Sequence, residues 1–193
     1  MLVLLSMYTI TDSQPFHLDC HSQNPSSSTR EINVRVEELA SGGLMLNFSL
    51  VGDVSILSIP ELRSSRRADN LWMHTCFEAF VIAGEGPEYL ELNFSPSGEW
   101  AVYAFRGYRD GVALDNELVP AISVRHSMDR LELDAEITPD ILPSDGPLRL
   151  GLSAVVEDAD GRLSYWALRH APGKPDFHHP DAFALQLGAV CVT

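Results

Sequence analysis

Hydrophobic and polar residues alternate with a period of two along much of the chain, a pattern typical of strands that bury one face. Residues 32–36 and 44–50 both follow it, and the Ser-Gly-Gly segment at 41–43 between them has the composition of a tight turn. The two segments therefore predict a β-hairpin. No segment has the apolar spacing of a long capped helix, and we expect at most one helical turn, at 139–143.

Further segments combine apolar alternation or apolar runs with flanking turn residues and are predicted as strands. They are residues 71–82, 88–94, 99–106, 120–126, 130–137, 148–154, 163–170 and 183–192. About nine or ten short strands, without an internal repeat or a linker, are typical of a sandwich or a barrel. We expect an all-β fold, an antiparallel two-sheet sandwich that forms a single domain over residues 1–193.

The formal net charge of −14 over 193 residues narrows the class of partner. Binding to a phosphate backbone depends on clustered Lys and Arg side chains. The dense basic cluster of Arg63, Arg66 and Arg67 lies in a serine-rich stretch and is expected to be a solvated loop. We therefore expect a small-molecule partner and no nucleic acid, and the oligomeric state is left open.

The cysteines and the N-terminal residues bear on the compartment. Cys20, Cys76 and Cys191 are too widely spaced for a zinc or redox motif, and the last two lie in apolar segments that favour buried, reduced thiols. The apolar stretch that begins at Met1 is too short for a secretory leader or a membrane span. It predicts an edge strand, or else translation begins at Met7. We expect a cytoplasmic protein that does not enter a membrane.

Four segments carry residue types that a plain core does not need. In the first, Trp72, His74 and Glu78 have the spacing of one strand face, so that an indole, an imidazole and a carboxyl group line one cleft. A carboxylate on an otherwise apolar strand is costly unless it is paired. The alternative is that Trp72 packs in the core and His74 lies at a sheet edge.

The second segment places Asn93 on the strand face of Glu91 and Trp100 just after a Ser-Pro-Ser-Gly turn. In the third, Trp166 and His170 share a face. Each segment has a simpler interpretation. The turn merely closes a hairpin, and the third segment is a core indole followed by an edge histidine.

The fourth segment is the loop of residues 171–180, which three prolines stiffen. Rigid loops that carry polar groups are common places for binding sites. The candidate ligand-binding residues in it are Lys174, Asp176, His178 and His179. The last three, together with His170, are also candidate metal ligands, although their spacing matches no established zinc pattern.

Motifs for nucleophilic and nucleotide chemistry are absent from the sequence. It contains no Gly-x-Ser-x-Gly elbow, no phosphate-binding glycine loop and no His-Glu-x-x-His pair. We therefore assign no catalytic residue.

Residues 71–81, 93–100 and 166–179 resemble bacterial DOMON-like domain proteins. More distantly, the chain is similar to family 9 carbohydrate-binding modules, in which an Asp-x-Leu-Trp segment precedes an acidic strand and a strand ending in Ser-Pro-x-Gly. The matching residues are Asp69, Leu71, Trp72, Glu78, Ser95, Pro96 and Gly98. The resemblance implies a jelly-roll-like sandwich with a ligand site on one face or rim.

The resemblance also implies two kinds of ligand. Sugar-binding modules stack two aromatic rings on a sugar, which here points to Trp72 with Trp166 or Trp100. Haem-binding DOMON domains use a methionine and a histidine as axial ligands. The candidates of these two types are Met73 or Met45 with His170 or His74.

The leading hypothesis is a non-catalytic domain that binds a carbohydrate or another small polar molecule and needs no cofactor. In a cytoplasmic setting, a soluble sugar or a cell-wall precursor fits better than a polysaccharide. The alternatives are a haem-binding redox module, a metal-dependent enzyme that uses the His-rich loop, and an interaction domain with an exposed strand edge. We expect one cleft beside the 174–179 loop to gather Trp72, His74, Glu78, Asn93, Trp166 and His170.

Overall fold

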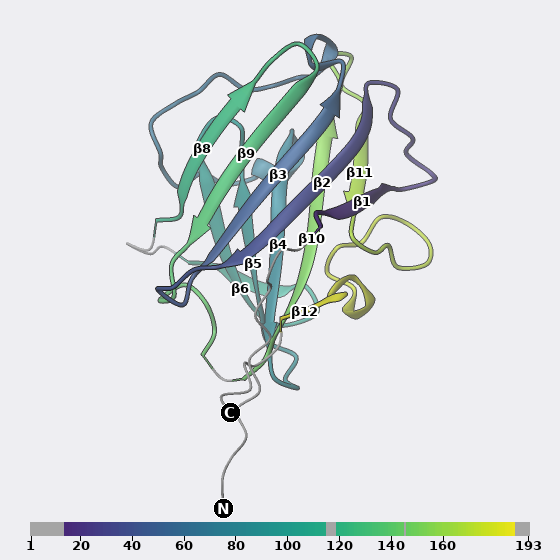
Figure 1. Ribbon diagram of the computed structural model, residues 1–193. Helices are drawn as coiled ribbons and strands as arrows, with labels where there is room; N and C mark the ends of the chain where they lie inside the picture. Colours follow the sequence, from purple (N-terminus) through teal and green to yellow (C-terminus); the bar gives the residue numbers. More distant parts are fainter. Residues whose placement is uncertain (1–13, 115–118, 145, 188–193) are drawn as a thin grey trace, which may run out of the picture.

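The computed structural model describes residues 14–114, 119–144 and 146–187, which form two facing antiparallel sheets (Figure 1). The twelve strands in these ranges are β1 (Phe16–Cys20), β2 (Thr29–Glu38), β3 (Leu44–Gly52), β4 (Cys76–Ala83), β5 (Tyr89–Phe94), β6 (Trp100–Gly107), β7 (Asp110–Ala113), β8 (Ala121–His126), β9 (Arg130–Ile137), β10 (Leu148–Glu157), β11 (Leu163–Ala167) and β12 (Leu185–Leu187). The antiparallel β-sandwich is confirmed, with more strands than expected.

The strands follow one hydrogen-bonded path, β7-β6-β5-β4-β10-β11-β1-β2-β3-β9-β8, with β12 beside β10. β1 takes part in both sheets, because residues 16–18 pair with β2 while Asp19 and Cys20 pair with β11. The first sheet, β8-β9-β3-β2, is therefore joined along one side to the second sheet, β7-β6-β5-β4-β10-β11.

The main core lies between the sheets and draws on alternate positions of both. Phe48 on β3 and Phe77 on β4 meet across it, with ring centroids 5.0 Å apart. In the first sheet, the outward positions of β2 and β9 are exposed or partly exposed, as period-two alternation predicts. In β4, by contrast, residues 76–82 are buried on both faces. The outer face of the second sheet is therefore covered.

The loop between β11 and β12 supplies part of this cover. It contains the short helix η3 (Pro180–Ala182), and its Phe183 packs with Phe80 and Tyr89 outside the sheet. Phe177 of the same loop packs against this cluster. The second sheet thus has a small apolar cluster on its outer face, beside which polar groups are held away from bulk water.

The strand predicted over residues 71–82 begins late, because the short helix η2 (Leu71–Met73) occupies its start and β4 follows. Asn70 precedes η2 in the left-handed conformation, with φ of 61°, and redirects the chain. Trp72 and Glu78 consequently do not lie on one strand face, which corrects the sequence-based interpretation.

Other segments also differ from the predictions. Residues 139–143 form a hydrogen-bonded turn in place of a helix, with the Leu142 N–H donating to the Pro139 carbonyl. β1, β7 and the short helix η1 (Val54–Ile56) lay outside the predicted elements. In the described part of the chain, no helix is long and apolar enough to cross a membrane.

Three predictions fall on parts of the chain outside the described residues. They are the N-terminal edge strand with its alternative start at Met7, most of the strand expected at 183–192, and the buried thiol of Cys191. Within the described ranges, Cys76 is fully buried, as expected, and forms no disulfide.

The basic cluster in the loop before η2 is held by ion pairs. Glu99 Oε1 lies 2.6 Å from Arg66 and 3.6 Å from Arg63, while Arg67 pairs with Asp69 at 2.6 Å. The loop is solvent-exposed, as expected, with the Arg63 and Arg66 side chains 58% and 61% exposed. Their ion pairs with Glu99 also fasten it to the start of β6.

Candidate ligand-binding site

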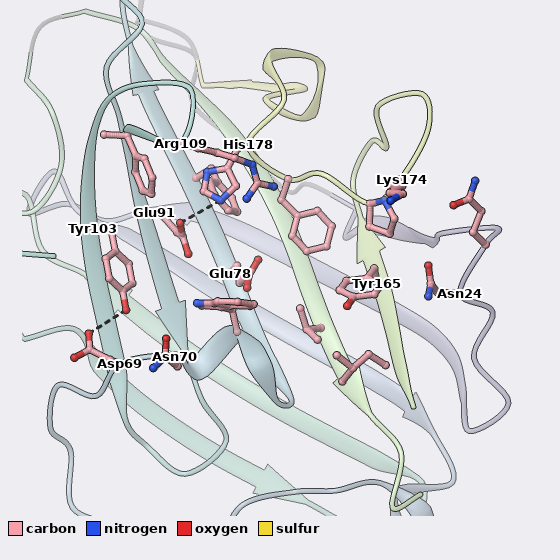
Figure 2. A pocket seen from close by; sticks show the side chains of 18 residues that line it. Asn24, Asp69, Asn70, Glu78, Glu91, Tyr103, Arg109, Tyr165, Lys174 and His178 are labelled. Carbon is pink, nitrogen blue, oxygen red and sulfur yellow. Dashed lines mark hydrogen bonds and ion pairs between the residues drawn. The ribbon is translucent and has the colours of Figure 1, made fainter. Parts of the chain in front are cut away.

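A cavity of about 960 Å³ lies on the outer face of the second sheet (Figure 2). Strand alternation determines which side chains face it, because neighbouring positions point into the sandwich core. The strand residues in its wall include Glu78 and Phe80 of β4, Glu91 of β5, Tyr103 of β6 and Tyr165 of β11. These five residues come from four different strands, so the sheet itself sets their spacing.

Loop residues complete the cavity. Asp69, Asn70 and Trp72 come from the segment that enters β4, and Arg109 comes from the turn between β6 and β7. The remaining wall comes from the loop of residues 171–180 and from the segment that follows β1, with Lys174, His178 and Asn24 among its members.

Two carboxyl groups form the floor of the cavity. Glu78 pairs in register with Asn93 on β5 while Phe80 pairs with Glu91, so the two glutamates are diagonal neighbours on adjacent strands. Glu78 is 2% exposed and Glu91 is 6% exposed. Ser153 donates a hydrogen bond to Glu78 Oε2 (3.0 Å), and the Asn93 amide donates to Glu91 Oε1 (2.7 Å).

This burial changes the acidity of both groups. Removal from water raises the pKa of Glu78 well above its ordinary value, and the nearby Glu91 carboxylate raises it further, against the effect of the Ser153 hydrogen bond. Burial also raises the pKa of Glu91, although the Asn93 hydrogen bond and the Arg109 charge oppose it. The pair therefore retains a proton at a pH where exposed glutamates have lost theirs.

His178 is neutral and its tautomer follows from its partners. Burial, and then the charge of Arg109, lower its pKa to about 4. The Tyr89 hydroxyl accepts the backbone N–H of Arg109 (3.2 Å) and so donates its own proton to His178 Nδ1 (2.8 Å). The Nε2–H group then points at Glu91, whose Oε2 lies 3.6 Å away.

A polar clamp fastens the 171–180 loop to the β6–β7 turn. Arg109 pairs with Asp176 Oδ1 at 2.8 Å, and the Tyr108 hydroxyl donates to Asp176 Oδ2 at 2.7 Å. Although burial opposes it, these hydrogen bonds lower the pKa of Asp176. The clamp keeps His178 and Lys174 in the cavity wall.

Replacing Asp176 with Ala should loosen this loop without unfolding the sandwich. Because Arg109 is half exposed, we expect a loss of only about 1 kcal/mol in the local opening free energy of residues 171–180. Amide hydrogen exchange in that loop should accelerate roughly fivefold. The matched control is Asp160→Ala, which removes an exposed Arg162 pair at 2.8 Å outside the cavity lining and should leave the loop unchanged. Equal exchange in the two variants would show that the clamp does not hold the loop.

Aromatic rings form the sides of the cavity. Trp72 is 49% exposed on η2, and Tyr103 donates from its hydroxyl to Asp69 Oδ1 at 3.2 Å. Phe105 stacks on Tyr89, with centroids 4.6 Å apart and ring planes 2° apart. The cavity thus combines ring faces with a buried polar floor.

The structure brings part of the predicted set together. Four of its residues line the cavity, namely Trp72, Glu78, Lys174 and His178. Asn93 is buried and bonded to Glu91, and Asp176 holds the loop through Arg109, so both contact lining residues. Four predicted residues therefore share the cavity wall and two lie directly behind it, while their role in ligand binding stays a prediction.

Five other predicted residues lie outside the lining. Trp100 and Trp166 are 2% and 4% exposed and belong to the sandwich core, so neither ring is accessible for stacking on a ligand. His74 contacts Glu157 (2.8 Å), His170 contacts the Asp19 carbonyl (2.8 Å), and His179 caps η3 by accepting the Asp181 N–H (3.2 Å). Their placement in one cleft was wrong, because one-residue offsets and the end of β11 direct them elsewhere.

The structure also adds residues to the candidate site. The sequence pattern could have identified Tyr103 and Tyr165, since each alternates with core residues on its strand and so faces away from the core. No sequence pattern identifies Arg109, because it lies in a turn and adopts a left-handed φ of 57°. Its role depends on contacts with residues distant in sequence, such as Asp176.

The haem and metal alternatives find no site in the cavity lining. It includes neither Met45 nor Met73, and neither His74 nor His170. Across the described ranges, no three His, Cys, Asp or Glu side chains are grouped so as to hold a metal ion. Haem binding stays a prediction, for which a Soret band after expression with added haem is the measurement.

Neither a family model nor a curated protein sequence matches this chain. Among solved structures, it is similar to a protein of Bacteroides uniformis ATCC 8492 that is provisionally described as carbohydrate-binding. The identity is 14%, the TM-score is 0.65, and the match covers 92% of this chain and 84% of the other. At this identity the likeness shows a shared fold over nearly the whole chain.

Two further matches are structures of a family 9 carbohydrate-binding module from Caldicellulosiruptor kristjanssonii. The glucose complex has a TM-score of 0.46 at 12% identity and covers 77% of this chain and 71% of the module. The cellotriose complex has a TM-score of 0.49 at 11% identity, and the match covers 99% of this chain and 89% of the module.

Proposed function

We propose that this cavity binds a small soluble carbohydrate, or another small polar molecule, and that the chain is a binding domain. The observation that carries the proposal is the combination of accessible ring faces with buried, orienting polar groups in one concave site. Such a combination is typical of small-ligand sites, in which apolar walls enclose the ligand and a few polar groups orient it.

The dimensions and the chemistry suit a sugar ring. A cavity of about 960 Å³ is at the upper end of the usual range for small ligands, so it accommodates one or two sugar units. The Trp72 ring offers a flat apolar face to the C–H side of a ring, while Glu91, Asn70 and Lys174 offer partners for hydroxyl groups. Arg109 and Tyr165 extend this polar rim.

The shared fold gives weaker support. The Bacteroides uniformis protein carries a provisional carbohydrate-binding description, which is compatible with the proposal. Because one fold hosts many functions, the cavity and not the fold is the basis of the proposal.

Replacing Trp72 with Ala tests the proposal. We expect wild-type protein to bind at least one sugar from a panel of soluble mono- and disaccharides in isothermal titration calorimetry. The variant should lose about 1–3 kcal/mol of binding free energy, since it loses a ring face in contact with the ligand. The matched control is Met73→Ala, because Met73 lies on the same short helix, is 50% exposed and is absent from the cavity lining. Sugar binding that is unchanged in the Trp72 variant would contradict the proposal.

A further inference from the structure

We infer that the ligand carries a protonated amine, as a 2-amino sugar does, and that this ammonium binds between the carboxyl groups of Glu78 and Glu91. The inference rests on the proposed function, because it assigns the chemical class of the ligand in the same cavity. It concerns two groups on the cavity floor that the fold itself leaves without a cation.

The first observation is the missing counter-ion. Glu78 and Glu91 line the cavity from adjacent strands, and no Lys or Arg side chain in the described part of the chain pairs with either one. The nearby cation Arg109 is engaged by Asp176 at 2.8 Å. Buried carboxyl groups are normally paired with a cation, so this floor is unusual.

The second observation is unused hydrogen-bonding capacity. Ser153 occupies one oxygen of Glu78, and no donor in the described residues contacts its other oxygen, Oε1. Asn93 occupies one oxygen of Glu91, while the nearest polar partner of the other oxygen, among the residues that the structure describes, is His178 Nε2 at 3.6 Å. Both carboxyl groups are at least nine-tenths buried and project into the cavity (Figure 2). A donor from a ligand would satisfy oxygens that the protein leaves open.

An ammonium group suits this arrangement better than a hydroxyl group. It has three donors and no acceptor, and its hydrogen bonds to carboxylates are about twice as strong as neutral ones. Two carboxyl groups on neighbouring strands can each accept one of these donors. A sugar hydroxyl group has a single donor, so it can bridge the two carboxyl groups only while one of them keeps its proton and donates to the hydroxyl oxygen. An ammonium can donate to both carboxyl groups when both are ionised.

Binding of an ammonium has a proton balance that a neutral ligand lacks. In the free protein, burial raises the pKa of both carboxyl groups and so favours a proton on the pair. A bound ammonium replaces that proton as the positive charge, and the proton leaves to solvent. The ligand gains hydrogen bonds to a carboxylate, and no covalent bond forms or breaks. A neutral sugar leaves the proton in place.

The neighbouring groups do not take up or release protons of their own between about pH 6 and 8, so they do not obscure the proton release expected on binding. His178 has a pKa of about 4 and stays neutral, while Asp176 and Arg109 stay charged. Burial raises the pKa values of the thiol and phenol groups that face the pair, so these keep their protons. They belong to Cys76, Tyr89 and Tyr103.

Calorimetric titration of the full chain with glucosamine, glucose and N-acetylglucosamine tests the inference. The three sugars share a ring, and only the first carries an ammonium. At pH 6.5 we expect glucosamine to bind at least roughly tenfold more tightly than the other two. Titrations in two buffers of different ionisation enthalpy should show net proton release for glucosamine alone.

Glu78→Gln should remove this preference while the fold is kept, since the amide has the same shape and no charge. We expect its affinity for glucosamine to fall roughly tenfold, its affinity for glucose to stay within about twofold, and proton release to disappear. The matched control is Glu88→Gln, an exposed glutamate just before β5, which should change none of these values.

The outcomes separate this inference from the proposed function. Glucose that binds as tightly as glucosamine, or glucosamine binding without proton release, would overturn the ammonium assignment and leave sugar binding intact. Failure of all three sugars and of the wider panel to bind would overturn both. Tight glucosamine binding that survives in Glu78→Gln and in Glu91→Gln would place the amine elsewhere and also end the inference.

Discussion

Trp166→Ala should lower the free energy of unfolding by about 3–5 kcal/mol, a large share of the stability of a single domain. Trp166 is 4% exposed on β11 and packs in the core between the sheets. Its indole Nε1 donates to the Ser164 hydroxyl at 3.0 Å, so truncation also leaves a partner without a donor. Urea denaturation followed by circular dichroism measures the loss.

The neighbouring Tyr165 is the control for this prediction. It lies on the same strand, but its side chain lines the cavity and is only partly buried. Tyr165→Ala should therefore destabilise the fold much less and affect ligand affinity more. A stability loss below about 1 kcal/mol for Trp166→Ala would show that its ring is not a core element.

The contrast between Trp166 and Tyr165 shows where sequence reasoning succeeded. Strands with one solvated face, such as β2 and β9, have polar residues at every second position, so their existence and their inward faces were predicted. In β4 nearly all residues are apolar and buried, and alternation is hidden. The sequence could not show which of the two faces carries the cavity.

Two aromatic assignments failed for that reason. Trp100 and Trp166 were placed at the ligand because tryptophans are common in sugar sites, whereas the residues at the opposite parity, Tyr103 and Tyr165, face the cavity. A shift of one residue along a strand moves a side chain to the other face of the sheet. The residue type shows that a ring could stack on a sugar, but it does not show to which face of the sheet the ring points.

Polar residues were the better guide. Glu78 was predicted as a site residue because an unpaired carboxylate is expensive inside an apolar strand, and it lies on the cavity floor. Arg109 was missed because turns have no periodicity to read. Its contact with Asp176 joins residues 67 positions apart and depends on the assembled sheet.

Replacing both floor glutamates with glutamine should make the protein more stable at neutral and higher pH. In the native protein the pKa values of Glu78 and Glu91 lie above the ordinary value of 4.5, so the folded state holds a proton where the unfolded chain has lost it. The stability that these two groups contribute is therefore fully present below about pH 4.5 and is lost as the pH rises towards their native pKa values. The double variant has no carboxylate to bury at these positions, so its unfolding free energy lacks the decrease with pH that Glu78 and Glu91 cause.

His178 has the opposite effect over a lower range. Its pKa falls from 6.5 to about 4 on folding, so its contribution to stability increases as the pH rises through that interval. The double variant keeps His178, and once the pH is well above 6.5 the contribution of this histidine to stability no longer changes with pH. In that range the pH dependence of the difference between variant and wild type reports on the glutamates. The control is Glu85→Gln with Glu88→Gln, in which two exposed carboxylates are replaced on the same hairpin.

The difference in unfolding free energy between Glu78→Gln/Glu91→Gln and wild type should therefore grow between pH 5 and pH 8. We expect it to reach on the order of 2–4 kcal/mol, since each ion buried without a counter-ion costs several kcal/mol. Urea denaturation at half-unit pH intervals measures this difference. The unfolding free energy of the exposed control variant should depend on pH as that of wild type does. If the unfolding free energy of the floor variant also had the pH dependence of wild type, the two carboxyl groups would ionise as freely as surface ones. That result would remove the physical basis for a proton held on the cavity floor, and with it the proton release expected when an ammonium binds.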